Sequence, residues 1–410
     1  MGGLARAFFA ALAGLDLARR VFEALPPLPP VRARVRVVAI GKAAPAMALG
    51  ALRRWPDRLE RVLVIAPDGT ACDAIAGDAR VEILRAPHPL PDARSVVAAD
   101  RALSFARGGP RDLLVALVSG GASSLACAPA SGLSLETKRS CVAALLASGA
   151  RIDEVNTVRR HLSRIKGGGL TRAASPGRVL ALIVSDVLQG AAWDIGSGPT
   201  VVDPTTVDDA RETVARYAPD LGDLPFVESL KASEPAARRQ RARIIASPDD
   251  LALGVAEALR KEGYTPRMLQ PSTADVGTLA AEYEKLAAGL AVGEALLRPA
   301  EPSLAVPRGA TGRGGRSGHL AALASRGLPA GVELLAGASD GVDGSSGAAG
   351  ALVDSGLGAH VAGGWARVAE ALAAFDSAAV HDEAGTALRS GPTGVNVADV
   401  HVLARRPPGS

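Results

Sequence analysis

Runs of apolar residues without polar alternation recur through the first two-thirds of the chain, and a segment of helical period follows most of them. Such runs are typical of strands buried on both faces, as parallel strands are when helices cover them. The pattern therefore predicts an α/β fold with a doubly wound sheet and right-handed crossovers. The strands are expected at residues 35–40, 61–66, 81–84, 112–118, 178–186 and 242–247.

Local signals mark the ends of several predicted helices. Ser134 is expected to cap one helix, and Ser247 to cap another that starts with Pro248. The segment 152–165 has a helical period and runs to three glycines at 167–169, so we expect its helix to end there.

The character of the chain changes after about residue 298, where prolines and Gly-rich loops surround a short predicted strand, SLAV (303–306). A further strand is expected at 400–404. We therefore predict a large domain over 1–297 and a smaller α/β domain over 298–410.

Composition fits an enzyme and excludes several other classes. The formal net charge of +4 is small for 410 residues, and the basic residues are scattered, so no nucleic-acid partner is expected. No apolar run is long enough to span a bilayer, and the N-terminal segment is an amphipathic helix and not a signal peptide. Cys72, Cys127 and Cys141 follow no metal or disulfide spacing, which indicates small side chains in a reducing, cytoplasmic compartment. A homodimer is left open.

Lysine is rare in this chain, since only six of the 46 basic side chains are lysines. Lys42 and Lys166 lie between glycines and apolar residues, where a functional role is favoured. The other four have charged, helix-like surroundings and are interpreted as surface residues. They are Lys138, Lys231, Lys261 and Lys285.

A small-residue turn follows the predicted strand 112–118, at the edge where open α/β sheets place their ligands. Glycine amides, serine hydroxyls and a helix that starts near Ala122 make it a candidate phosphate cradle. A tight turn without a ligand has about equal weight, because no Walker A lysine follows. The turn consists of Ser119, Gly120, Gly121, Ala122, Ser123 and Ser124.

Two charged residues follow other strands at the same predicted edge. Lys42 comes one glycine after the strand 35–40 and can reach a phosphoryl oxygen. Asp186 ends the strand 178–186 and is a candidate base or Mg²⁺ partner, the alternative being a turn cap.

Polar side chains also recur at helical spacing before the three glycines. Asn156, Arg159 or Arg160, and Lys166 form a stripe that can bind a carboxylate or phosphate. A solvated basic face is an equal alternative, and His161 is interpreted as structural.

The Gly-rich loops of the second domain carry further candidates. Arg316 stands at a helix start, where its guanidinium and backbone amides could bind a phosphate together. Asp340 and Asp343 suggest a hard-metal site or an Asx turn, and Asn396 lies in a third polar loop.

The ordered motifs resemble glycerate 2-kinases of the MOFRL type, a group often labelled hydroxypyruvate reductase. The resemblance rests on AIGKAAPAM, APHPLPD, LVSGGASSL, NTVRRHLSRIKGGGL, SGPTVVDPTT, GRGGR, SDGVDG and GPTGVNVAD, and it covers residues 5–404. It implies a Rossmann-like N-terminal domain, a smaller C-terminal domain and a cleft between them for ATP, Mg²⁺ and D-glycerate.

The resemblance also implies roles for particular residues. Lys42 and Arg316 correspond to the family's active-site lysine and arginine, and Ser119–Ser124 to its Gly-rich loop. We expect Asp186 to act with them, and Asp186, Glu301 and Asp340 to hold Mg²⁺. Substrate contacts are expected from Asn156, Arg160, Lys166 and Asn396.

The sequence departs from the family pattern near these residues, at 188–191, 298–302 and 317–319. A kinase for another small hydroxy acid, or a protein that binds nucleotide or acid without turnover, therefore stays open. A hydroxypyruvate reductase is disfavoured because no Gly-x-Gly-x-x-Gly follows the first strand.

Overall fold

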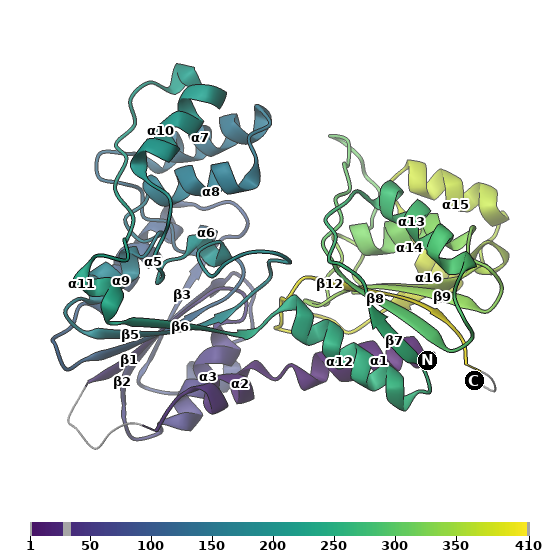
Figure 1. The fold of residues 1–410 in the computed structure, drawn as a ribbon, viewed down its shortest axis with the longest axis horizontal. Helices are drawn as coiled ribbons and strands as arrows, with labels where there is room; N and C mark the ends of the chain where they lie inside the picture. Colours follow the sequence, from purple (N-terminus) through teal and green to yellow (C-terminus); the bar gives the residue numbers. More distant parts are fainter. Residues whose placement is uncertain (1, 28–33, 408–410) are drawn as a thin grey trace. The chain divides into compact units, whose positions relative to one another are not determined.

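The computed structural model describes residues 2–27 and 34–407, which fold into two compact units (Figure 1). The first unit comprises residues 17–186 and 190–246. The second unit comprises the described residues up to 16, residues 187–189 and those from 247 onward. Residues 247–297, which the sequence prediction placed in the large domain, lie in the second unit and contribute strands to its sheet.

A parallel six-stranded sheet in the order β3-β2-β1-β4-β5-β6 forms the centre of the first unit, as the apolar runs predicted. Val, Leu and Ala fill both faces of its central strands. The chain order reverses between β1 and β4, which makes their carboxyl ends a topological switch point. The strands are β1 Val35–Ile40, β2 Leu59–Pro67, β3 Val81–Ala86, β4 Leu113–Val118, β5 Arg178–Val184 and β6 Gln240–Ala246.

Helices cover both faces of this sheet (Figure 1). Helices α2 and α3 lie on one face, and α5 and α9 lie on the other. The single-turn helices α4, α6 and α11 lie in connections. The bounds are α2 Leu17–Ala24, α3 Ala44–Arg54, α4 Asp73–Ala76, α5 Ala93–Ala106, α6 Ala122–Leu125, α9 Gly169–Ala174 and α11 Pro235–Arg238.

Three helices, α7 Leu135–Ala147, α8 Ile152–His161 and α10 Val207–Tyr217, form a separate layer with its own apolar core. Ser134 caps α7 as predicted, since its hydroxyl accepts from the Thr137 amide at 2.9 Å. Helix α8 ends at His161, before the glycines where the sequence predicted its end. The chain turns away there because the Arg164 amide donates to the Ala128 carbonyl at 2.9 Å.

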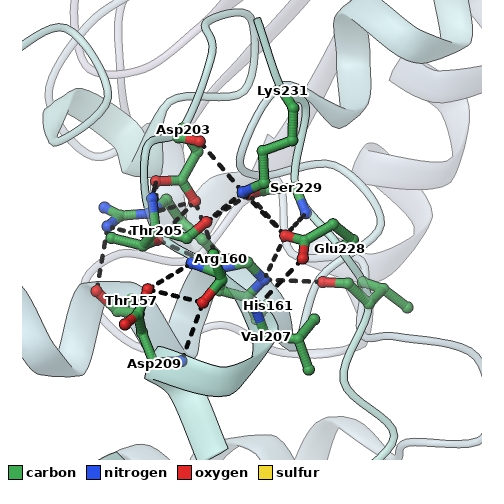
Figure 2. Close-up of polar contacts among 12 residues, drawn as sticks. Thr157, Arg160, His161, Asp203, Thr205, Val207, Asp209, Glu228, Ser229 and Lys231 are labelled. Carbon is green, nitrogen blue, oxygen red and sulfur yellow. Dashed lines mark hydrogen bonds and ion pairs between the residues drawn. The ribbon is translucent and has the colours of Figure 1, made fainter. Parts of the chain in front are cut away.

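A buried polar network ties the long connection between β5 and β6 to α8 (Figure 2). Arg160 Nε donates to Asp203 Oδ2 at 3.0 Å, and the Asp203 side chain is 0% exposed. His161 Nδ1 lies 2.9 Å from the Val227 carbonyl and Nε2 lies 3.2 Å from Thr205 Oγ1. His161 is therefore structural, as expected.

The second unit contains a mixed sheet in the order β11-β10-β9-β12-β8-β7. Strand β12 is antiparallel to both of its neighbours, whereas β7 and β8 are parallel. The predicted strand SLAV is not formed; Ser303 makes only an isolated bridge to Asp275. The strands are β7 Thr265–Met268, β8 Glu294–Ala300, β9 Val332–Ala338, β10 Gly350–Asp354, β11 Ala387–Leu388 and β12 Asp399–Arg405.

Helices α1 and α12 pack together against one face of this sheet, and α13 and α14 cover the other (Figure 1). Ser247 caps α12 as predicted. Gly337 on β9 admits α1, because a Cβ there would lie 2.7 Å from the Phe8 ring. The helices are α1 Gly3–Gly14, α12 Pro248–Lys261, α13 Val276–Ala288, α14 Arg316–Ser325, α15 Gly364–Ala373 and α16 Ser377–Ala384.

Two features of the composition can be compared with the structure. All three cysteines are free and buried, as their spacing indicated. Within the part of the chain that the structure describes, no helix is long and apolar enough to cross a membrane.

Replacing Asp203 with Ala should strongly destabilise the first unit. The substitution removes the hydrogen-bonded carboxylate of the buried Arg160 guanidinium and leaves it only the longer pair with Asp194 at 3.6 Å. Breaking a buried pair in this way costs about 3–5 kcal/mol. Urea unfolding followed by circular dichroism measures the change in the free energy of unfolding.

Asp208→Ala is the matched control, since the Asp208 side chain is 90% exposed and, among the described residues, pairs with Arg211 alone, on its own helix. Its stability should change by less than about 0.5 kcal/mol. Equal effects of the two substitutions would contradict the stabilising role of the network.

Candidate functional site

The loops after β1 and β4 meet at the switch point of the first unit. Ile40 is in register with Val118, and the Lys42 amide donates to the Gly120 carbonyl at 2.9 Å. Gly41 has φ +133°, and a Cβ there would lie 2.1 Å from Ser119 Oγ. The backbone therefore approaches so closely here that only glycine fits.

The residues of the Gly-rich turn divide into two groups. Ser119 is fully buried, and its hydroxyl accepts from the Ala43 amide at 3.1 Å, so it links the two loops. Helix α6 is a single turn, and its dipole is weaker than the sequence suggested. Gly120 and Ala122 are buried as well, whereas Gly121, Ser123 and Ser124 line a cavity.

This cavity, the first cavity, has a volume of about 1070 Å³ and lies entirely within the first unit. Of the residues predicted from the sequence, Asn156, Lys166 and Asp186 also line it. Apolar side chains of α7 and α8 form part of its wall. They are Leu135, Val142, Leu146 and Ile152.

Asp186 and Lys42 influence one another electrostatically. Burial raises the pKa of the Asp186 carboxyl, and the positive charge of Lys42 opposes that rise. A carboxylate with a raised pKa at the end of a strand is suited to accept a proton. His88, from the loop after β3, also lines the cavity. It lies in the motif APHPLPD, in which no site residue was predicted from the sequence.

Two buried lysines occupy the wall of the first cavity. Burial lowers the pKa of Lys166 to about 7 and that of Lys138 to about 8. Lys166 Nζ donates to Ser123 Oγ at 2.8 Å, and Lys138 Nζ donates to the Leu162 carbonyl at 2.7 Å. The interpretation of Lys138 as a surface residue was therefore wrong, although the scarcity of lysine was a signal for it.

Arg160, which the sequence suggested as a substrate contact, is not among the residues that line the first cavity. Its guanidinium is held in the buried network by Asp203. Its neighbour Arg159, the alternative in the stripe, does line the cavity, and its Nη1 donates to Asn156 Oδ1 at 3.2 Å.

The second unit has a cavity of its own, the second cavity, with a volume of about 570 Å³. Arg316, Asp340 and Asn396 line it. The Arg316 guanidinium donates to Asp399 through Nε at 2.8 Å and Nη2 at 3.2 Å, and it pairs with Glu301 at 3.4 Å. Burial raises the pKa of Asp399 to about 6, and the Arg316 charge opposes the rise.

The Asp343 carboxylate accepts hydrogen bonds from the backbone amides at the start of α14, which the sequence suggested as phosphate-binding groups. Its Oδ1 accepts from the Ser317 amide at 3.0 Å and its Oδ2 from the Gly318 amide at 2.8 Å. The start of α14 is thus capped by the protein itself, and burial raises the pKa of this carboxyl to about 6. The Arg316 side chain is left as the basic group that this segment presents to the second cavity.

His319 lines the second cavity one helical turn from the start of α14. Its ring stacks on Phe375 with centroids 5.7 Å apart, and burial lowers its pKa. Its Nδ1 is buried and has no hydrogen-bond partner in the described ranges. From the sequence, His319 was noted only as part of the segment 317–319, where the chain departs from the family pattern.

The three carboxylates predicted to hold Mg²⁺ are divided between the two units. Asp186 belongs to the first unit, whereas Glu301 and Asp340 belong to the second. Asp340 Oδ1 accepts from the Val342 amide at 3.1 Å, which is the Asx-turn alternative. In residues 2–27 and 34–407, no group of three or more His, Cys, Asp or Glu side chains could hold a metal ion.

Two family models and several known proteins match this chain in sequence. Residues 4–225 match a family model described as a domain of unknown function, DUF4147, and residues 294–399 match the MOFRL family. A protein of Agrobacterium vitis named "Putative hydroxypyruvate reductase" is 38% identical, over 98% of this chain and 93% of its own length. The "D-glycerate 2-kinase" of Thermotoga maritima is 31% identical, over 93% of each chain.

A solved structure is similar along the whole chain. The crystal structure of glycerate kinase from Thermotoga maritima matches with a TM-score of 0.83 and 28% identity, covering 98% of both chains.

Replacing Lys138 with Met should remove a pH-dependent penalty on folding. Because the folded pKa is about 8 against an ordinary value of 10.5, the unfolded chain binds more protons between these values. The stability of the wild type should therefore rise relative to the variant by on the order of 2 kcal/mol between about pH 7 and pH 10. Urea unfolding at several pH values measures this difference.

Lys166→Met should give a larger rise, because the pKa of Lys166 is lowered further. Lys261→Met is the control, since the Lys261 side chain is 76% exposed. A difference between wild type and Lys138→Met that does not vary with pH would show that the lysine is not buried as a charge.

Proposed function

The chain belongs to the MOFRL-type glycerate kinase family, and from this premise we propose that it transfers the γ-phosphoryl group of ATP to D-glycerate, giving 2-phosphoglycerate. The observation that carries the proposal is the first cavity, which Asp186 and part of the Gly-rich turn line at the switch point of a parallel sheet. Lys42 does not line this cavity, but it lies beside the turn and its charge acts on Asp186. Phosphoryl transfer needs positioning and charge stabilisation more than covalent chemistry from the protein.

In the proposed reaction, the hydroxyl oxygen of the acid attacks the γ-phosphorus and the bond to the β-phosphate oxygen breaks. ADP leaves with the electron pair of that bond, and the hydroxyl proton passes to a base. Asp186 fits the role of base because burial raises its pKa. Lys42 and Arg316 are proposed to stabilise the charge on the transferring group.

The acid is proposed to bind through its carboxylate to Asn156 and Lys166, both of which line the first cavity. Arg159 replaces Arg160 in this proposal, because Arg160 is paired with Asp203. Asn396 stays a proposed substrate contact of the second unit, and Gly121, Ser123 and Ser124 stay the proposed nucleotide contacts.

Mg²⁺ is proposed to arrive as part of the MgATP substrate. Magnesium usually keeps several waters and binds through one or two carboxylates together with substrate phosphates. Single carboxylates such as Asp186 in the first unit and Asp340 in the second are suited to that use. Glu301 is less suited, because it pairs with Arg316.

A reductase is less well supported than a kinase. The turn after β1 reads Gly41-Lys42-Ala43, and its lysine stands where a dinucleotide fold needs glycine for close approach to the pyrophosphate. A kinase for another small hydroxy acid stays the alternative, since His319 and its neighbours depart from the family pattern. The cytoplasm, suggested by three free cysteines, is the proposed location, and a homodimer stays a prediction.

Lys42→Ala should lower kcat for ADP release by at least about a hundredfold, because it removes a charge that stabilises the transition state. The assay follows ADP release from MgATP with and without D-glycerate, and then with a panel of small hydroxy acids. Circular dichroism and urea unfolding should show an unchanged fold.

Lys285→Ala, an exposed lysine on α13, is the control and should turn over like the wild type. Near-normal turnover in Lys42→Ala would refute the assignment of Lys42. Wild-type protein that releases no ADP with any acceptor would favour a binding protein without turnover.

A further inference from the structure

Two buried lysines and one half-buried arginine line the first cavity without a carboxylate partner among the described residues, and the exposed Arg139 lines it as well. Lys138 comes from α7, Arg159 from α8 and Lys166 from the turn before α9. Lys138 and Lys166 are each only 4% exposed. Within residues 2–27 and 34–407, none of the three forms an ion pair with a carboxylate.

The present partners of these side chains are neutral oxygens. Lys166 Nζ donates to the Ser123 carbonyl at 2.5 Å, Lys138 Nζ to the Leu162 carbonyl at 2.7 Å, and Arg159 Nη1 to Asn156 Oδ1 at 3.2 Å. Arg160, the next residue in α8, shows the contrasting solution, because Asp203 compensates its charge. Buried charge without a counter-charge is costly, so two buried lysines beside the half-buried Arg159 on one cavity wall indicate a negative ligand.

We propose that Lys138, Arg159 and Lys166 form an oxyanion-binding subsite in the first cavity, which takes either the carboxylate of the acid substrate or a phosphate of the nucleotide. The identity of these two ligands rests on the proposed function, whereas the binding of an oxyanion does not. The subsite adds Lys138 to the residues already proposed to contact the substrate. It also groups Arg159 with the two lysines as one set of anion-binding side chains.

The choice of lysine at two of the three positions fits this proposal. The chain uses arginine for most of its basic residues, yet two of its six lysines are buried in this one wall. A buried lysine can release its proton when the cavity is empty, whereas arginine cannot. With the pKa of Lys138 at about 8 and that of Lys166 at about 7, both lysines lose part of their charge near neutral pH.

An oxyanion should reverse this loss, so its binding should be coupled to proton uptake. At about pH 7.5 the two lysines together lack about one proton, which a bound anion would restore. The other titratable groups that act on them are the thiols Cys127 and Cys141. The remaining charged residues of the cavity wall are Asp92, Glu136, Arg139, Asp186 and Asp194.

Isothermal titration calorimetry of the full chain tests the proposal. D-glycerate, ADP and inorganic phosphate are titrated separately at about pH 7.5, each in two buffers with different ionisation enthalpies. At least one probe should bind with uptake of about one proton. If none of the three binds, or if those that bind take up no proton, the proposal is overturned on the wild type alone.

The variants Lys138→Met and Lys166→Met locate the effect, with Lys261→Met on α12 as the matched exposed control. Each cavity variant should weaken binding by at least about tenfold, because it removes one charged hydrogen-bond donor, and should reduce proton uptake. Selective weakening of D-glycerate identifies the carboxylate as the ligand group, and selective weakening of ADP identifies a phosphate. Unchanged affinities in both variants would overturn the proposal.

Turnover separates this proposal from the proposed function. Loss of oxyanion binding in the variants, combined with no ADP release by the wild type, would support the subsite and refute the kinase. Normal turnover and normal affinity in both variants would support phosphoryl transfer, but would refute the subsite together with the proposed contact between Lys166 and the acid.

Discussion

The arrangement of the first unit depends on how closely the backbone of Gly41 approaches Ser119. A Cβ on Gly41 would lie 2.1 Å from Ser119 Oγ, so any other residue would push the loops after β1 and β4 apart. Their approach allows the Lys42 amide to reach the Gly120 carbonyl and the Ala43 amide to reach the Ser119 hydroxyl. These bonds fix the point from which the Lys42 side chain leaves the backbone beside the Gly-rich turn.

Buried cations are treated in two ways in this chain, and the difference separates stability from binding. Arg160 is matched by Asp203, and this paired guanidinium group holds distant segments together. The lysines of the first cavity have only neutral oxygen partners, a costly arrangement for folding. Proteins retain such local costs mainly where a ligand uses them.

The Gly-rich loop before α14 serves a different purpose from the one its composition suggests. A Cβ on Gly315 would lie 2.2 Å from Asp343 Oδ1, so the absence of a side chain lets this carboxylate reach the helix start. Asp343 then satisfies the Ser317 and Gly318 amides, which would otherwise attract an anion. The loop thereby positions Arg316 through its backbone while the amides stay occupied.

The parallel strands, the helix caps and the placement of Lys42 and Asp186 after strands could be predicted from the sequence, because these features follow from periodicity and from contacts within a few residues. The tertiary packing was needed to show that Arg159 lines the first cavity while Arg160 pairs with Asp203, and that Lys138 is buried. It also decided that α1 packs with α12, which fixes the unit boundaries. These outcomes depend on packing between segments far apart in the chain, which no local pattern records.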